Sequence, residues 1–237
     1  MNRKKLIGFV DDNIFGNPKF AKKLLRALIS YRIRWAAQAS VTVARDDELL
    51  KLAAASGCMA LLIGFETLST ANLAAVGKRV NVVDEYETII RKIHSHGIAI
   101  HGFFILGLDE DDEDVFERTI RFAQKMRLES AQFAWLVPYP GTALCESLDK
   151  AGRIVTKDWS QYESNVVFEP KLMTREMLQK GHDWVWREFY SLPSIWRRIG
   201  VAHRNMVAFW ATNLSFRAFS RRKSQSFVFG TPRLSGY

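Results

Sequence analysis

The sequence is poor in cysteine. Its 237 residues contain only Cys58 and Cys145, which stand far apart along the chain. Two thiols exclude a disulfide framework, and they are too few for a zinc or iron–sulfur site built on three or four clustered cysteines. We therefore expect no metal site from this sequence alone, and a chain with so few thiols suits a reducing cytosol.

Long hydrophobic runs are also absent. No uncharged apolar stretch reaches the roughly 18 residues that a membrane-spanning helix requires. The N-terminal run is basic and then briefly apolar, but it is too short for a signal peptide and leads directly into Asp11 and Asp12. These features predict a cytoplasmic protein.

Acidic residues are missing from the last part of the chain. None follows Glu188, whereas the same stretch contains eight cationic residues: Arg197, Arg198, Arg204, Arg217, Arg221, Arg222, Lys223 and Arg233. These residues supply nearly all of the net charge of +9. The body of the protein is therefore close to neutral, and the basic character belongs to the C-terminal region.

Short apolar runs alternate with helical patterns along the first part of the chain. Strands are predicted at Lys5–Val10, Ile33–Ser40, Cys58–Phe65, Ile98–Leu106 and Ala131–Val137. Helices are predicted from Pro18, at Glu48–Ala55 with Asp46 or Asp47 as the cap, at Val83–His96 and at Val115–Met126. This alternation predicts an α/β fold with a parallel sheet, either as a barrel or partial barrel or as a doubly wound sheet.

The alternation stops beyond Gly152. The sequence therefore predicts an α/β body over residues 1–150, a mostly helical and basic extension over 151–223, and a loose tail over 224–237. Within the extension, Val166–Phe168 is predicted as a short strand, and Thr174 is predicted to cap a helix that runs to about Ser191.

Polar residues follow the predicted strands where each one ends. In chain order they are Asp11, Asp12 and Asn13, then Gln38 and Ser40, then Glu66, then Gly107 to Glu110, then Pro138 to Gly141. The carboxyl ends of parallel strands meet at one edge, where ligands bind. Carboxylates and amides suit hydroxyl and amine groups, and no GxxxxGK or GxGxxG motif provides for a polyphosphate. Taken singly, each residue also fits a helix cap, and the acidic run Asp109–Asp114 fits a solvated helix N-terminus.

Three histidines lie near the fourth predicted strand. His94 and His96 are at a helix end, where they complement the helix dipole, and His101 alternates within the strand. Their spacing does not place them on one face, so we assign no metal ligands among them.

The strand-end series resembles the radical SAM superfamily, in which S-adenosylmethionine (SAM) is the cofactor. The resemblance rests on Phe9-Val10-Asp11-Asp12-Asn13, Gln38-Ala39-Ser40, Gly64-Phe65-Glu66, Phe104 to Asp109, and Pro138-Tyr139-Pro140-Gly141-Thr142. Its similarity is greatest to the branch that commonly carries an N-terminal cobalamin-binding domain. The resemblance extends over residues 5 to 200 and includes a C-terminal segment with Gly152, Asp158-Trp159 and Phe168-Glu169-Pro170.

This resemblance implies a partial (β/α) barrel, a SAM site, and a 4Fe–4S cluster held by a CxxxCxxC loop. Asp11, Asp12 and Asn13 would lie near the methionine amino group, and Glu66 would contact the cofactor. Ile105, Gly107 and Glu110 match the GxIxGxxE motif that supports the adenine, with Phe103 in place of the first glycine. The remaining cofactor-binding candidates are Gln38, Ser40 and Pro138.

The sequence departs from the family in one respect. It contains no CxxxCxxC motif and no cobalamin-binding region, and it starts at what would be the second strand of the barrel. We expect a gene fragment, a subunit completed by a separate N-terminal polypeptide, or a degenerate relative. The first two predict a radical SAM enzyme whose cluster is supplied by other sequence, with cobalamin in the full-length relative. The third predicts a non-catalytic remnant or interaction protein. Both cysteines are interpreted as small buried hydrophobic residues.

The basic region Trp196–Lys223 interleaves its arginines with Trp196, Phe209, Trp210, Phe216 and Phe219. One interpretation is a helix packed against the barrel with arginines facing water. A second is a basic amphipathic helix that lies on an anionic membrane surface, at the inner face of the membrane. Nucleic acid is the least favoured partner because no stacking platform is evident.

Overall fold

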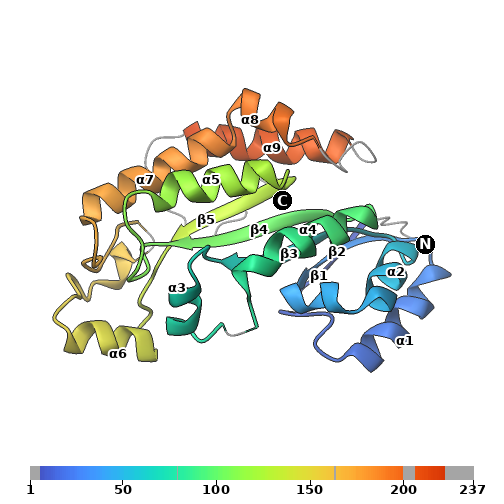
Figure 1. Ribbon diagram of the computed structural model, residues 1–237, viewed down its shortest axis with the longest axis horizontal. Helices are drawn as coiled ribbons and strands as arrows, with labels where there is room; N and C mark the ends of the chain where they lie inside the picture. The colour runs from blue at the N-terminus through green and yellow to red at the C-terminus, as the bar shows by residue number, and fades with distance from the viewer. Residues whose placement is uncertain (1–5, 79, 163, 200–205, 222–237) are drawn as a thin grey trace.

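The computed structural model describes residues 6–78, 80–162, 164–199 and 206–221. Five strands form one parallel sheet in the order β1-β2-β3-β4-β5 (Figure 1). The strands are β1 (Leu6–Phe9), β2 (Arg34–Ala39), β3 (Cys58–Glu66), β4 (Ala99–Leu106) and β5 (Ser130–Trp135). The predicted α/β class and parallel strand order are confirmed, and the sheet formed by the described residues does not close on itself.

Helices follow the strands in the predicted rhythm. They are α1 (Pro18–Ile29), α2 (Asp47–Ala55), α3 (Thr70–Ala75), α4 (Tyr86–Ser95), α5 (Val115–Lys125), α6 (Ala143–Lys150), α7 (Arg175–Phe189), α8 (Leu192–Arg197) and α9 (Met206–Arg221), with 3-10 turns η1 (Val41–Arg45), η2 (Val83–Glu85) and η3 (Trp159–Gln161). Asp46 caps α2, because its side chain accepts a hydrogen bond from the Leu49 amide. The region predicted as one helix over Val83–His96 is a 3-10 turn followed by α4.

One face of the sheet is covered by helices, and the other is open except where α9 (Met206–Arg221) lies near the amino ends of β4 and β5. On β3, Leu61, Ile63 and Phe65 point toward the helices and are fully buried. The Phe65 ring lies 5.0 Å from the ring of Tyr86 in α4 and 6.2 Å from that of Phe122 in α5. The alternate residues, such as Leu62, are only half-buried. This second set defines the open face, which in a closed barrel would be the interior.

The β1 edge of the sheet is exposed. β1 is the outermost strand, and Leu6 is 62% exposed although it is apolar. Val10, directly after the strand, is 90% exposed. An edge strand with exposed apolar side chains is suited to pairing with another strand.

The other edge is covered by the C-terminal helices. α7 lies beside α5 and β5, and α8 and α9 follow above them in Figure 1. The prediction that the arginines of this region face water is wrong for Arg198, which is fully buried. Its Nη1 donates to the carbonyls of Leu128 and Glu129, just before β5, at 2.8 and 3.0 Å. Buried carbonyls require such a donor, so Arg198 satisfies the backbone at this edge.

Two further predictions for the extension differ from the structure or lie beyond it. Val166–Phe168 does not form a strand; an isolated antiparallel bridge joins Phe168 to Ile154. A single bridge is too short to build a ladder, so the segment stays outside the sheet. The predicted tail 224–237 lies outside the described residues.

Candidate functional site

The first group of predicted site residues joins the loops after β1 and β2. Asn13 Oδ1 accepts hydrogen bonds from the Phe15 amide at 3.2 Å and, more weakly, from the Ser40 amide at 3.5 Å. Ser40 Oγ in turn caps the η1 turn by accepting from the Thr42 amide. Asn13 and Ser40 therefore order the two loops, and the side chains of Asp11 and Asp12 stay exposed beside them.

Glu66 ends β3 in a strained conformation. Its φ is +65°, in the left-handed region that a glutamate adopts at a cost of about 1–3 kcal/mol. Its Oε1 lies 3.0 Å from Lys78 Nζ. A Cβ added at Gly64 would come within 2.6 Å of that same oxygen, so the carboxylate occupies the space that a side chain at Gly64 would fill. The strand end thus carries a half-buried carboxylate folded back over a glycine on the open face.

The loop after β4 is held by a buried side-chain pair. Asp111 Oδ2 accepts from the amides of Gly107 and Leu108, both at 3.0 Å, and its Oδ1 accepts from Asn72 Nδ2 at 2.8 Å. Asn72, on α3, accepts from the Glu110 amide at 3.0 Å. Burial raises the pKa of Asp111 to about 6, against the opposing effect of the two amide hydrogen bonds. Asp111 therefore holds the loop after β4 in place and is not the solvated helix-end residue that was predicted. We name the hydrogen-bonded pair of Asn72 and Asp111 the clamp.

The remaining residues of the β4 and β5 ends shape this region. Gly107 has φ +84°, and a Cβ there would lie 2.5 Å from Leu178 Cδ2 on α7, so only glycine fits. Ile105 lies on the open face and is half-buried, whereas Pro138 is buried after β5. Glu66 at the end of β3 is in register with Phe104 on the neighbouring strand β4, and Ile105 is the next residue along β4. Glu110 itself is exposed.

Gln38 lies away from this edge. Gln38 belongs to a row of residues that are in register across four strands. The other members of the row are Leu62 on β3, His101 on β4 and Ser130 on β5. This row crosses the middle of the open face, because Leu62 precedes Glu66 on the same strand. The structure thus brings Asn13 together with Ser40 and places Glu66 and Ile105 near the ends of neighbouring strands, but it places Gln38 deeper on the open face.

His101, to which the sequence assigned no role, lies on the open face of the sheet. Its Nδ1 lies 2.8 Å from Ser130 Oγ, and its ring lies 4.8 Å from Phe103 and 6.0 Å from Phe216 of α9. Burial lowers the pKa of His101 to about 4, so the imidazole is neutral at physiological pH. The signal for it was the period-two pattern of β4, which puts His101 on the same face as Ile105.

The other two histidines have structural partners. His94 Nε2 lies 3.2 Å from Glu129 Oε2, and His96 Nδ1 lies 2.9 Å from the Lys92 carbonyl. Across the described ranges, no three His, Cys, Asp or Glu side chains form a group that could hold a metal ion.

A pocket of about 430 Å³ lies at the opposite end of the sheet. It is bounded by the amino ends of the strands and by α9, with Arg34, Cys58 and Glu129 from the sheet side and Phe209 and Asn213 from the helix. The pocket is therefore separate from the strand ends where the predicted site residues lie.

The family resemblance implies two bound groups, an iron–sulfur cluster and SAM, and the residues of this chain fit only the second. Cys58 is buried, and desolvation raises the pKa of its thiol, while Cys145 is half-buried on α6. Neither belongs to a loop of three cysteines, so the residues present do not fit an iron–sulfur cluster. The strand end at Glu66 does fit a ligand with hydroxyl and amine groups, because it places a carboxylate on the open face next to the ordered loop at Gly107.

Comparison with protein families gives a match to the radical SAM superfamily over residues 1–123. The chain is 34% identical to a bacteriochlorophyllide d C-12(1)-methyltransferase from Chlorobaculum tepidum, over 94% of this chain and 48% of that protein. It is 27% identical to an anaerobic magnesium-protoporphyrin IX monomethyl ester cyclase from Cereibacter sphaeroides, over 87% of this chain and 32% of that protein. The chain thus spans half or less of the length of these relatives.

A solved structure shares the fold. It is the radical SAM methyltransferase TsrM from Kitasatospora setae with cobalamin and a 4Fe–4S cluster bound, with a TM-score of 0.54 and 17% identity over 65% of this chain and 32% of that one. The family match covers more than half of the sequence, and the open parallel sheet agrees with it. The chain belongs to the radical SAM superfamily.

Proposed function

We propose that this chain forms the SAM-binding part of a radical SAM methyltransferase whose iron–sulfur cluster is held by residues outside this sequence. The observation that carries the proposal is the end of β3, where the Glu66 carboxylate folds over Gly64 on the open face. Relatives named as methyltransferases or as a methylase support the reaction class.

The residues divide into three roles toward SAM. Asp11 and Asp12 are exposed carboxylates that would attract the methionine amino group, and Asn13 orders their loop. Glu66 would accept hydrogen bonds from the cofactor, with Lys78 as its counter-ion in the absence of ligand. Ile105 is half-buried on the open face and would present an apolar surface to the adenine, whereas the buried turn at Gly107, with φ +84°, would shape the loop beside it.

When bound, SAM supplies an activated methyl group and, on reductive cleavage, a 5′-deoxyadenosyl radical. The residues of this chain bind and orient that cofactor, and the clamp between Asn72 and Asp111 keeps the Gly107 loop in place. His101 contributes a neutral hydrogen-bonding group to the open face, below the strand ends. In the cobalamin-associated branch, cobalamin would belong to the part of the full-length relative that this sequence does not contain.

The exposed β1 edge supports completion by other residues. Leu6 and Val10 present apolar side chains beside an edge strand. A strand from a separate N-terminal polypeptide, or from sequence outside these 237 residues, would cover them and bring the cluster loop to the strand ends.

Isothermal titration of the chain with SAM tests the proposal. We expect binding, and a loss of about tenfold or more in affinity for Glu66→Gln, because a hydrogen bond to a charged group contributes about 1.5–3 kcal/mol. Glu113→Gln is the matched control, since Glu113 is exposed on the α5 side of the loop. If wild type does not bind SAM, the non-catalytic interpretation is favoured, and if Glu66→Gln binds as well as wild type, the role assigned to Glu66 is wrong.

Anaerobic reconstitution with iron and sulfide tests the cluster separately. The chain alone should retain no 4Fe–4S cluster, because its two cysteines lie on different elements. Retention of four irons per chain would contradict this assignment.

A further inference from the structure

The last described helix, α9, uses one face to attach to the body of the protein. Phe209, Asn213 and Phe216 are buried along this face. Asn213 Nδ2 donates to the Glu129 carbonyl at 3.0 Å, and its Oδ1 accepts from Arg198 at 2.9 Å. Phe216 packs against the Trp186 ring at 5.8 Å. The position of α9 is therefore determined without any contribution from its opposite face.

That opposite face is apolar and faces solvent. Val207 is 83% exposed and Leu214 is 47% exposed, and Ala211 and Ala218 are exposed between and beyond them. Positions 207, 211, 214 and 218 have the spacing that places side chains on one helical stripe. A helix with apolar residues on two opposite sides is expected to be covered on both.

Two tryptophans extend this stripe onto α8. Trp210 lies one turn from Val207 and from Leu214, and its ring meets that of Trp196 edge-on at 5.2 Å. Trp196 is 64% exposed. We name the surface formed by Trp196, Val207, Trp210, Ala211, Leu214 and Ala218 the α8–α9 apolar face.

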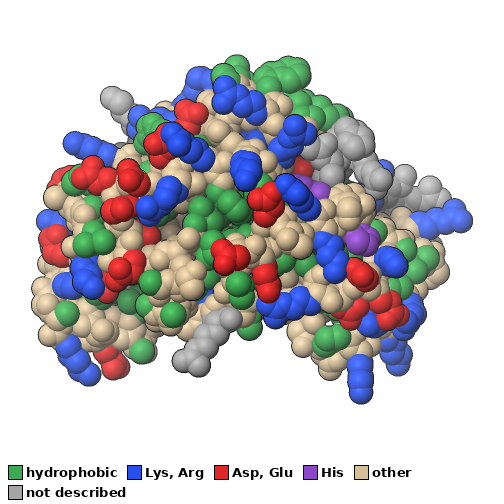
Figure 2. All heavy atoms as spheres, viewed as in Figure 1, with side chains coloured by type: hydrophobic (Ala, Val, Ile, Leu, Met, Phe, Trp, Pro, Cys, Tyr) green, Lys and Arg blue, Asp and Glu red, His purple; other side chains and the backbone are tan. Residues whose placement is uncertain are grey.

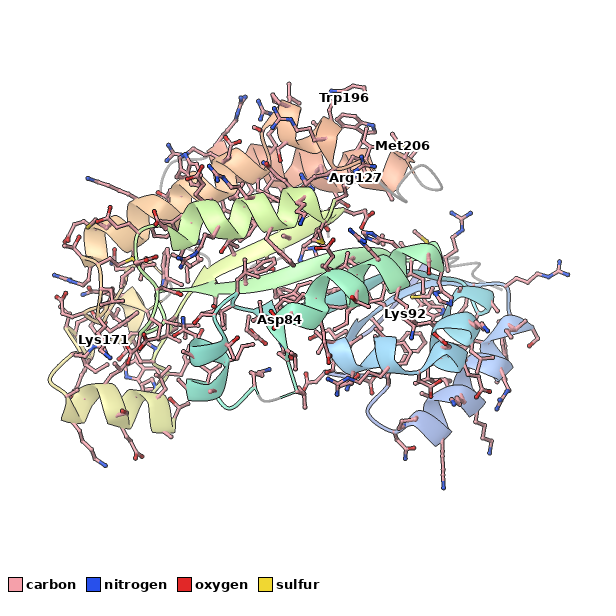
Figure 3. All side chains as sticks on the ribbon, viewed as in Figure 1. Asp84, Lys92, Arg127, Lys171, Trp196 and Met206 are labelled. Atoms are coloured by element: carbon pink, nitrogen blue, oxygen red, sulfur yellow. The ribbon has the colours of Figure 1, made fainter. Side chains whose placement is uncertain are left out.

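The α8–α9 apolar face lies at one end of the molecule. Figure 3 shows Trp196 projecting from α8 away from the sheet, with Met206 at the start of α9 beside it. Figure 2 shows hydrophobic side chains gathered over α8 at the same end. In Figure 1, α8 and α9 lie at the top of the view, whereas α3 and α6, which follow the carboxyl ends of β3 and β5, lie at the bottom. A large partner on this face would leave the proposed SAM site uncovered.

The charged residues that α8 and α9 themselves carry have one sign. Arg197 and Arg221 are exposed at the ends of α8 and α9, and Arg217 is half-buried beside them. No acidic residue follows Glu188 in the sequence. Exposed tryptophan, a stripe of aliphatic side chains and arginines without acids match the interface of an anionic lipid bilayer, where tryptophan prefers the head-group level and arginine pairs with phosphate.

We propose that the α8–α9 apolar face docks this protein on an anionic membrane surface. The face would lie in the head-group region, with Val207 and Leu214 entering the acyl boundary and the arginines contacting lipid phosphates. Among the helices that the structure describes, none is long and apolar enough to cross a membrane. The proposed interaction is attachment to the surface, and it goes beyond the proposed function because it is independent of SAM.

Co-sedimentation with vesicles tests this proposal. The full chain should pellet with vesicles of phosphatidylglycerol and phosphatidylcholine and remain in solution with phosphatidylcholine alone. Leu214→Glu should reduce binding about tenfold or more, because it removes an apolar side chain that enters the acyl boundary and puts there a charge that opposes burial. Trp196→Ala should reduce it by a similar factor. Raising the salt concentration should weaken binding of wild type.

Leu172→Glu is the matched control. Leu172 is 52% exposed and is remote from α8 and α9 in the sequence, so the same substitution there should leave vesicle binding unchanged. Because Leu214 and Leu172 are both surface residues, the two variants should have the wild-type urea midpoint. Absence of binding by wild type, or equal binding by Leu214→Glu, would overturn the proposal. Self-association that Leu214→Glu abolishes, without vesicle binding, would also overturn it in favour of a protein interface.

Discussion

The clamp between Asn72 and Asp111 depends on the direction of single hydrogen bonds. Asp111 accepts three, from the amides of Gly107 and Leu108 and from Asn72 Nδ2. Asn72 Oδ1 accepts a fourth from the Glu110 amide. Replacing Asp111 by asparagine keeps the shape of the side chain but converts one acceptor oxygen into a donor. Whichever way the new amide is turned, at least one donor then faces another donor.

The size of the effect follows from burial. Asn72 and Asp111 are 0% and 1% exposed, so water cannot replace a lost partner. An unsatisfied buried polar group costs about 1–3 kcal/mol, and we expect Asp111→Asn to lower the free energy of unfolding by that amount. Asp112→Asn is the control. Asp112 pairs with Arg118 at the surface, so its loss should cost less than about 1 kcal/mol.

The exchanged double variant, Asn72→Asp with Asp111→Asn, should recover most of the loss. In that pair the new carboxylate at position 72 would accept from the Glu110 amide and from the new side-chain amide at position 111. The oxygen of that amide would accept from Gly107 and Leu108. Urea unfolding at about pH 8 measures all four proteins with residue 111 of wild type ionised, since the pKa of Asp111 is about 6. A double variant no more stable than Asp111→Asn would refute the assigned hydrogen-bond directions.

Two further predictions concern the buried polar groups of the sheet and the C-terminal helices. Arg198→Met should lower the free energy of unfolding by about 3–5 kcal/mol, because it leaves the carbonyls of Leu128 and Glu129 without this donor. Arg197→Met is the control: Arg197 is exposed, so this variant should have the wild-type stability in the same urea titration. His101→Gln should make the free energy of unfolding depend less steeply on pH between about pH 4 and pH 6.5. The folded pKa of His101 is about 4 and the unfolded value is 6.5, so between these values only the unfolded chain binds the proton and stability falls as pH falls. Urea midpoints of wild type and His101→Gln at several pH values check this, and equal slopes would contradict it.

The local sequence determined the elements of this fold. The apolar runs and their turn residues predicted all five strands to within about two residues, because strands of parallel α/β sheets read as short continuous apolar runs that end at polar residues. Capping was equally local: Asp46 and Thr174 cap helices through side-chain bonds to amides three residues ahead. The order of polar strand ends also carried the family resemblance.

The contacts that make the site depend on the tertiary structure. Asn72 and Asp111 meet because parallel strands bring the loops after β3 and β4 together, across 39 residues of sequence. His101 and Phe216 meet because α9 reaches the open face of the sheet. Arg198 looks like a surface cation in a basic region, and only the packing of α8 against the start of β5 supplies the carbonyls that make its burial favourable. Residue type and spacing predict local hydrogen bonds and faces, but the partner of a buried polar group is set by which distant elements pack beside it.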